Sequence, residues 1–199
     1  MTRHRRSEET VRRLLDTALE VHPGDFTLRA VTTRSGVSMG SLYHHFGSLE
    51  GLAAALYSRC MDDLLDTLIA AVEQSASARD GVRQAVLAYL GFSAGHPDKA
   101  RFIHAAPYAI DLGPHAERIA AGKAARLNRL VAWIRPHMDA GTVASLPMAQ
   151  VEMLLIGPVA EVTRRWLAGA PEIDLAESAR LLPDRIWASL RAGSDTSRR

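Results

Sequence analysis

The clearest catalytic pattern lies at residues 36–40, where the sequence GVSMG matches the G-x-S-x-G of a hydrolase nucleophile elbow. An elbow needs a β-strand before its serine. Residues 27–35 instead carry the apolar spacing of a helix, and no strand pattern of useful length occurs elsewhere. We therefore interpret the match as accidental and expect no catalytic residues.

The histidines do not form a metal site by spacing. His44 and His45 are adjacent, so on a helix they point about 100° apart. His96 and His104 are eight residues apart and could share a helix face, but no carboxylate completes a convincing triad. No glycine-rich phosphate loop with a lysine is present either. We expect no metal, no cofactor and no enzymatic activity.

Three hydroxyl residues each stand where a helix is expected to begin. Thr27, Ser38 and Ser48 can cap their helices, and a helix N-terminus with a hydroxyl group favours phosphate binding. In the helix after Ser38, Leu42 and Phe46 turn toward the core, so the outward face is polar. Hydrogen-bonding side chains on such a face suit phosphates and base edges.

These residues are positioned by helices along the whole chain. Apolar spacing and Pro or Gly punctuation predict an all-α fold of about nine helices. We expect them to begin near Ser7 and to occupy residues 7–22, 27–35, 38–45, 48–72, 81–94, 98–110, 115–135, 147–168 and 174–191. Pro136 is expected to end the seventh of these helices.

Residues 27–46 read TLRAVTTRSGVSMGSLYHHF, a short helix, a glycine turn and a second short helix. That is the pattern of a helix-turn-helix, whose second helix enters the DNA major groove. From about residue 7 to residue 56 the chain resembles the TetR family of bacterial regulators, most specifically in GVSMGSLYHHFGSLEGL. The resemblance implies a homodimer that binds a palindromic operator through its N-terminal heads, and a C-terminal body that binds a small ligand.

The outward face of the second helix and the positions matched to the family predict the DNA contacts. Three arginines of the basic N-terminal segment are added to them. The predicted DNA-binding residues are Arg3, Arg5, Arg6, Thr27, Ser38, Met39, Gly40, Ser41, Tyr43, His44 and Ser48. Leu49 stands where the family often has a lysine, and Thr32 replaces an inner-face alanine. The missing lysine shifts the expected phosphate contacts toward the N-terminal arginines.

The net charge of +2 is informative only when it is resolved along the chain. Residues 1–13 hold five arginines against two glutamates, while the remaining 186 residues carry a net charge of −1. The positive excess therefore precedes the helix-turn-helix, where a polyanion would bind.

The cysteine content and hydropathy limit the class of protein. A single cysteine, Cys60, cannot form an internal disulfide, and it lies in the apolar stripe of residues 49–72, where we expect a buried side chain. No stretch reaches the ~20 apolar residues that span a membrane. We expect a cytoplasmic protein with no membrane partner.

Aromatic and polar side chains concentrate between residues 81 and 140. Ligand pockets are mostly apolar with a few orienting polar groups, although the same aromatics could be ordinary core. The candidate ligand-binding residues are Tyr89, Phe92, Phe102, His104, Tyr108, Trp133 and Met138.

The last two predicted helices are apolar on more than one face, which a four-helix seam between two protomers would explain. A wholly intramolecular core is the alternative. The candidate interface residues are Val151, Leu155, Pro158, Val159, Val162, Trp166, Leu175, Leu182, Ile186 and Leu190.

These observations predict a DNA-binding domain at residues 1–47 and a ligand-binding and dimerisation domain at residues 48–199. The expected function is that of a homodimeric repressor, released from double-stranded operator DNA by a small-molecule effector. The alternative is a helical ligand carrier or interaction protein that does not bind DNA.

Overall fold

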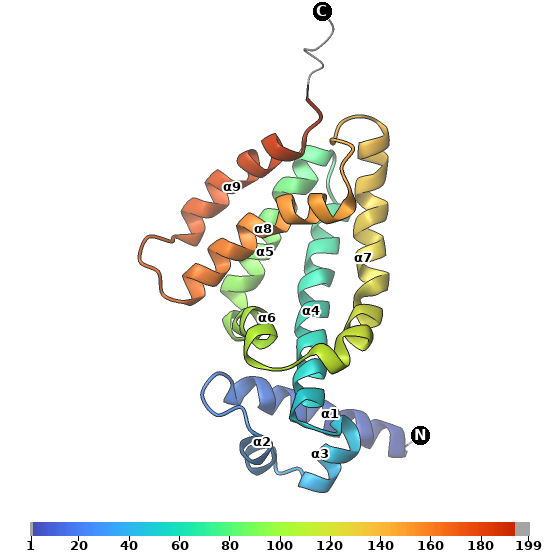
Figure 1. Ribbon diagram of the computed structural model, residues 1–199, viewed down its shortest axis with the longest axis vertical. Helices are drawn as coiled ribbons and strands as arrows, with labels where there is room; N and C mark the ends of the chain where they lie inside the picture. The colour runs from blue at the N-terminus through green and yellow to red at the C-terminus, as the bar shows by residue number, and fades with distance from the viewer. Residues whose placement is uncertain (1, 194–199) are drawn as a thin grey trace, which may run out of the picture. The chain divides into compact units, whose positions relative to one another are not determined.

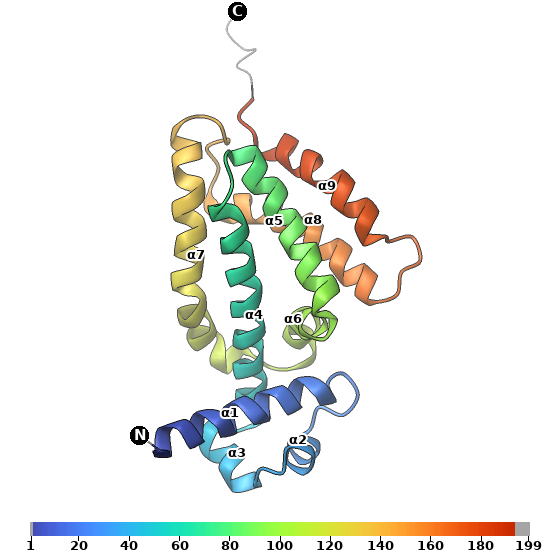
Figure 2. The ribbon, with the colours of Figure 1, turned by 180° about the vertical axis from the view of Figure 1, so that it is seen from behind.

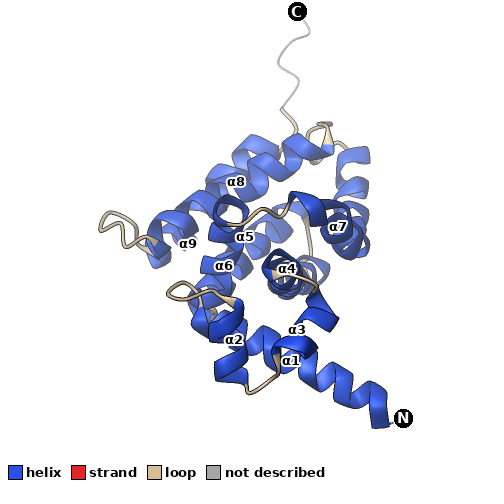
Figure 3. Ribbon diagram, turned by 60° about the horizontal axis from the view of Figure 1, so that its bottom comes forward, coloured by secondary structure: helices blue, strands red, loops and turns tan. Residues whose placement is uncertain are grey.

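The computed structural model describes the backbone of residues 2–193 and the side chains of residues 4–193. Over that range Figure 3 shows helices and connecting loops, and the predicted all-α class with nine α-helices is confirmed. The elements, labelled in Figure 1, are α1 (Thr2–Val21), α2 (Leu28–Ser35), α3 (Met39–Phe46), α4 (Leu49–Glu73), α5 (Ala78–Gly95), α6 (Pro97–Ala109), the 3-10 turn η1 (Gly113–His115), α7 (Ala116–Asp139), α8 (Met148–Leu167) and α9 (Leu175–Leu190).

The largest differences from the predicted helix boundaries lie at the start of α1 and at the end of α7. Helix α1 begins at Thr2 rather than near Ser7, so the basic N-terminal residues continue the helix. Pro136 does not end α7, which continues to Asp139. A proline inside a helix removes one backbone hydrogen bond, here the one to the Ala132 carbonyl, and α7 continues for three residues beyond it.

The chain divides into two compact units, and each is described by itself. The first contains residues 1–62 and 98–123, which include α1, α2, α3, the first part of α4 and α6. Its core holds Leu14, Val31, Leu42, Leu52 and Leu56, all fully buried. Arg59 of α4 also donates to Asp16 of α1 at 2.7 Å.

An aromatic cluster joins α6 to the connection between α1 and α2 inside this first unit. The His22 ring lies edge-on to Phe102 of α6 at 4.9 Å between ring centres, and Phe26 lies 5.5 Å from Phe102. Phe102 is fully buried. The unit therefore extends beyond the predicted boundary after residue 47, because the first part of α4 and all but the first residue of α6 belong to it together with the N-terminal helices.

The second unit contains residues 63–97 and 124–199, and its helices α5, α8 and α9 pack closely on one another. Figures 1 and 2 show α8 and α9 side by side from opposite directions. Within the unit α5 also lies against α7, because Gly81 leaves room for the Trp133 ring that a Cβ would collide with. Arg126 of α7 holds the Asp66 carboxylate of α4 with two bonds of 2.8 and 3.0 Å.

The apolar stripe of α4 is buried from Leu52 onward, while Leu49 at its start is half-buried. Leu52, Leu56 and Cys60 are fully buried in the first unit, and Leu64 and Leu68 are 4% exposed in the second. Cys60 therefore packs as a small apolar residue in the core.

Candidate nucleic-acid interface

Helix α3 is positioned by a turn and a cap that the sequence predicts. Gly36 ends α2 in the left-handed region at φ +68°, which favours glycine because other residues are strained there. Ser38 then begins α3, its hydroxyl oxygen accepting the Ser41 backbone N–H at 3.2 Å. Together they turn the chain so that α3 presents one face to the core and the other outward.

The two faces of α3 differ sharply in exposure. Leu42 is fully buried, whereas Tyr43 is 50% and Met39 is 39% exposed. Gly40 and His44 are also exposed, and Ser41 is half-buried. The face predicted to read DNA is therefore open to solvent.

On this face, packing within the protein gives no reason for a glycine at position 40. A Cβ built there meets no atom within 4 Å, and the backbone is helical. Glycine inside a helix costs about 0.5–1 kcal/mol relative to alanine. The space above Gly40 is thus available to a molecule outside the chain.

The three predicted capping hydroxyls are not equally free to bind phosphate. Thr27 accepts the Ala30 N–H at 3.1 Å and donates its proton to the Asp25 carboxylate at 3.1 Å. Ser38 only accepts, and within the described chain its hydroxyl proton has no protein acceptor. A free O–H is what an anionic oxygen requires, so Ser38 is better prepared than Thr27.

Ser48 is also engaged within its own helix. Its oxygen accepts the Gly51 N–H at 3.1 Å. The Ser48 hydroxyl, together with the backbone N–H of Glu50, hydrogen-bonds the Glu50 carboxylate and lowers the pKa of that group. The start of α4 therefore carries a stable negative charge close to a predicted phosphate contact.

The cations of the predicted interface come from α1 and not from α3, which contains no lysine or arginine. Arg5 and Arg6 are exposed on α1, while the Arg3 side chain lies outside the described residues. Arg12 is held by Glu9 at 2.6 Å, and this pairing lowers the pKa of Glu9. Leu49, at the position of the family's lysine, is half-buried.

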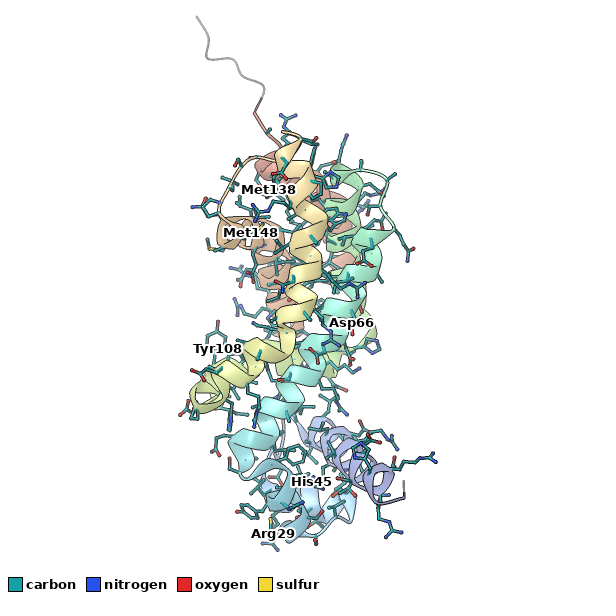
Figure 4. All side chains as sticks on the ribbon, turned by 90° about the vertical axis from the view of Figure 1, so that its right-hand side faces the viewer. Arg29, His45, Asp66, Tyr108, Met138 and Met148 are labelled. Carbon is teal, nitrogen blue, oxygen red and sulfur yellow. The ribbon has the colours of Figure 1, made fainter. Side chains whose placement is uncertain are left out.

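Arg29 is a cation that the sequence analysis missed. It is exposed on the first turn of α2, and its side chain has no hydrogen bond or ion pair with any residue the structure describes. Figure 4 shows Arg29 projecting from the N-terminal helices α1, α2 and α3, which we call the head. The available signal was an arginine two residues after the capping Thr27, at a helix start that the sequence already predicted.

The predicted ligand-binding residues are divided between the two units. Phe102, His104 and Tyr108 belong to the first unit, and Tyr89, Phe92, Trp133 and Met138 to the second. Phe102, Tyr89, Phe92 and Met138 are buried. Tyr108 is 88% exposed at the end of α6, where it projects into solvent in Figure 4. The ligand-binding role of these residues therefore stays a prediction.

The predicted dimer stripe divides into buried and exposed side chains. Val151, Val159, Ile186 and Leu190 lie in the protomer's own core. The six that keep surface exposure are Leu155, Pro158, Val162, Trp166, Leu175 and Leu182. Two apolar residues outside the stripe, Met153 at 63% and Leu181 at 54%, are also exposed.

The catalytic and metal patterns gain no support among the described residues. The GVSMG segment connects two helices, α2 and α3. No group of three or more histidine, cysteine, aspartate or glutamate side chains there could hold a metal ion. Over the same range, no helix combines the length and the apolar character needed to cross a membrane.

The N-terminal part of the chain matches known sequences. Residues 14–56 match the model of bacterial regulatory proteins of the TetR family. An uncharacterized HTH-type transcriptional regulator of Mycobacterium tuberculosis is 32% identical over 98 residues, and one of Mycobacterium bovis matches equally well. The match covers 47% of this chain and 50% of each relative, so it spans half the length of these curated relatives.

Solved structures share the fold over most of the chain. A TetR family regulator from Shewanella sp. PV-4, described as putative, has a TM-score of 0.76 at 19% identity, covering 92% of this chain and 99% of that one. FadR of Bacillus subtilis, solved in complex with stearoyl-CoA, has a TM-score of 0.73 at 16% identity, covering 88% and 97%. Residues 14–56 thus match the TetR family of bacterial regulatory proteins, and the chain shares the fold of solved TetR-family structures, which together support its assignment to that family.

Proposed function

We propose that this protein is a cytoplasmic, homodimeric repressor that binds a palindromic operator through α3 and leaves it when a small molecule binds. The observation that carries the proposal is the outward face of α3. There, Tyr43 and His44 are exposed, and Gly40 has open space above its Cα. The Ser38 hydroxyl on the same face has no hydrogen-bond acceptor among the described residues.

The proposed division of labour follows from the chemistry of these groups. Tyr43, His44 and Ser38 supply hydrogen bonds to phosphates and base edges, and Gly40 lets the helix backbone approach the groove floor. Arg5, Arg6 and Arg29 supply the electrostatic attraction that α3 lacks. In two-fold symmetric readers of this kind the two recognition helices lie about 34–36 Å apart.

Release by a ligand requires that the ligand prefer a different spacing of the two heads. The His22–Phe26–Phe102 cluster supports such coupling, because it joins α6 to the α1–α2 connection by direct ring contacts. A ligand that displaces α6 would then move the head with it. FadR of Bacillus subtilis, a structural neighbour, was solved with stearoyl-CoA, which supports a ligand-binding role for the helices beyond the head.

The test uses a duplex selected from the DNA flanking the protein's own gene, with affinity measured by fluorescence anisotropy at several salt concentrations. We expect Tyr43→Ala combined with His44→Ala to abolish specific binding while the far-ultraviolet circular dichroism stays unchanged. We expect Arg29→Ala to reduce the log–log salt slope by about 0.9, the value of one phosphate contact. His96→Ala and Arg135→Ala, both exposed in the second unit, are the matched controls.

The ligand carrier without DNA binding makes the opposite prediction. It requires that no duplex bind in a salt-dependent way, and that Tyr43→Ala with His44→Ala change nothing. A thermal-shift screen of metabolites, followed by duplex displacement with each stabilising compound, tests the effector. Stabilising compounds that leave the duplex bound would contradict ligand-induced release.

A further inference from the structure

A surface groove in the second unit carries a charge pattern that the proposed DNA binding does not use. The groove has a volume of about 630 Å³ and lies between α5 and α9. Ligand sites commonly have volumes of about 300–1,000 Å³. It is lined by Ser77, Arg79, Asp80, Arg83, Leu87, Ala179, Arg180, Pro183 and Asp184.

The two carboxylates of the groove already have partners. Asp184 accepts from Arg79 at 2.9 Å, and Asp80 accepts from the Gln84 amide at 3.3 Å. Asp80 also accepts from the backbone N–H of Ala76 at 3.4 Å. Their negative charges are therefore partly compensated within the protein.

The other two arginines of the groove are not engaged. Arg83 and Arg180 come from the two facing helices, and neither side chain has a hydrogen bond or ion pair with any residue in the described part of the chain. Elsewhere in this unit Arg126, Arg129, Arg164 and Arg165 all hold carboxylates. Two unengaged arginines that line one groove suit a carboxylate or phosphate, because each guanidinium can donate two parallel N–H bonds to such an anion.

The groove changes from charged to apolar along α5. Leu87 follows Arg83 by one turn, a rise of about 6 Å. Ala179 and Pro183 of α9 add apolar surface to the lining, and Pro183 is buried. A ligand that matches both parts has an anionic head and a short apolar body.

We propose that this groove binds an amphipathic organic anion, with Arg83 and Arg180 holding its carboxylate or phosphate and Leu87, Ala179 and Pro183 contacting its apolar part. Arg79 belongs to the same site as a cation that Asp184 partly neutralises. The proposal does not depend on DNA binding, because none of these residues lies in the head.

Octanoate is the probe, titrated into the full chain in Tris buffer by isothermal calorimetry. We expect octanoate to bind, inorganic phosphate to bind at least tenfold more weakly, and octylammonium not to bind. Arg83→Gln combined with Arg180→Gln should weaken octanoate binding at least tenfold. Asp184→Asn should strengthen it severalfold, because the substitution frees Arg79 and removes a negative charge.

The matched control is Arg135→Gln with Arg185→Gln, which removes the same charge from exposed positions outside the groove. It should leave octanoate affinity within twofold of the wild type. Failure of octanoate to bind, equal binding by the Arg83/Arg180 variant, or weaker binding by Asp184→Asn would overturn the proposal. So would equal binding of octylammonium or of inorganic phosphate. Duplex binding of the Arg83/Arg180 variant, measured in parallel, should match the wild type and keeps the two proposals separate.

Discussion

At the scale of single residues, Gly40 is expected to lower the stability of the fold while favouring DNA binding. Because a Cβ at this helical position meets no other atom, alanine should raise the free energy of unfolding by about 0.5–1 kcal/mol. If α3 enters the major groove, the added methyl group lies between the helix and the bases. Gly40→Ala should therefore raise the urea midpoint and lower duplex affinity at least tenfold. A variant that is stabilised and binds DNA normally would contradict close approach of α3 at this position.

His22 provides the residue-scale prediction for pH. Burial lowers the pKa of this histidine below its ordinary value of 6.5, with Asp98 opposing and Arg101 adding to the effect. Its buried Nδ1 has no partner among the described residues. The folded protein therefore binds the proton less readily than the unfolded chain, and the stabilising effect of neutral His22 is complete above pH 6.5 and is lost as the pH falls below it.

Urea unfolding between pH 5 and pH 8 measures this effect. The wild type should lose more stability on acidification than His22→Phe, which keeps a ring against Phe102 and carries no titratable group. Identical pH profiles for the two proteins would show that His22 is not the group responsible.

At the scale of elements, Gly51 sets the approach of α3 to α4. It is buried in the first turn of α4, and a Cβ there would collide with the Phe46 carbonyl oxygen at the end of α3. That atom belongs to the backbone and cannot rotate away. Gly51→Ala should cost about 1–3 kcal/mol of unfolding free energy and weaken duplex binding, because α3 must shift.

The control for this prediction is Gly122→Ala in α7. Gly122 is exposed and a Cβ there meets nothing within 4 Å, so alanine should be neutral or slightly stabilising. If Gly51→Ala unfolds at the same urea concentration as the wild type, Gly51 does not set the approach of α3 to α4.

At the scale of the whole molecule, the exposed apolar side chains of α8 and α9 predict the dimer seam. Met153 and Leu181 are the large apolar residues of these helices that are most exposed in the protomer. Met153→Glu with Leu181→Glu should give a monomer by light scattering and weaken binding to a palindromic duplex. Thermal unfolding at low protein concentration should change little, since neither side chain is in the protomer core.

Asn128→Glu with Ala132→Glu adds the same charge to exposed positions of α7 and should leave the dimer intact. A Met153/Leu181 variant that remains dimeric would place the seam on another surface.

The helices and the caps and exposed face of the candidate site follow from local sequence. Leu42 is buried and Tyr43 exposed because helical periodicity alone decides which side of α3 each occupies. Thr27 accepts the Ala30 N–H because it precedes the first turn of α2, as its position in the sequence predicts. Its donation to Asp25 is seen only in the structure. Arg12 pairs with Glu9 three residues before it, whereas Arg29 has no side-chain partner among the described residues.

The sequence by itself therefore determined the all-α class, the caps, the glycine turn and the outward face of α3, because each depends on residues within about one turn of one another. Tertiary structure decided that α6 packs with the head through Phe102, and that Val151 and Ile186 lie in the core while Met153 and Leu181 face outward. It also decided which arginines remain free, as Arg126 pairs with Asp66 sixty residues away. Burial and ion pairing depend on contacts between distant segments, and these exist only once the helices have packed.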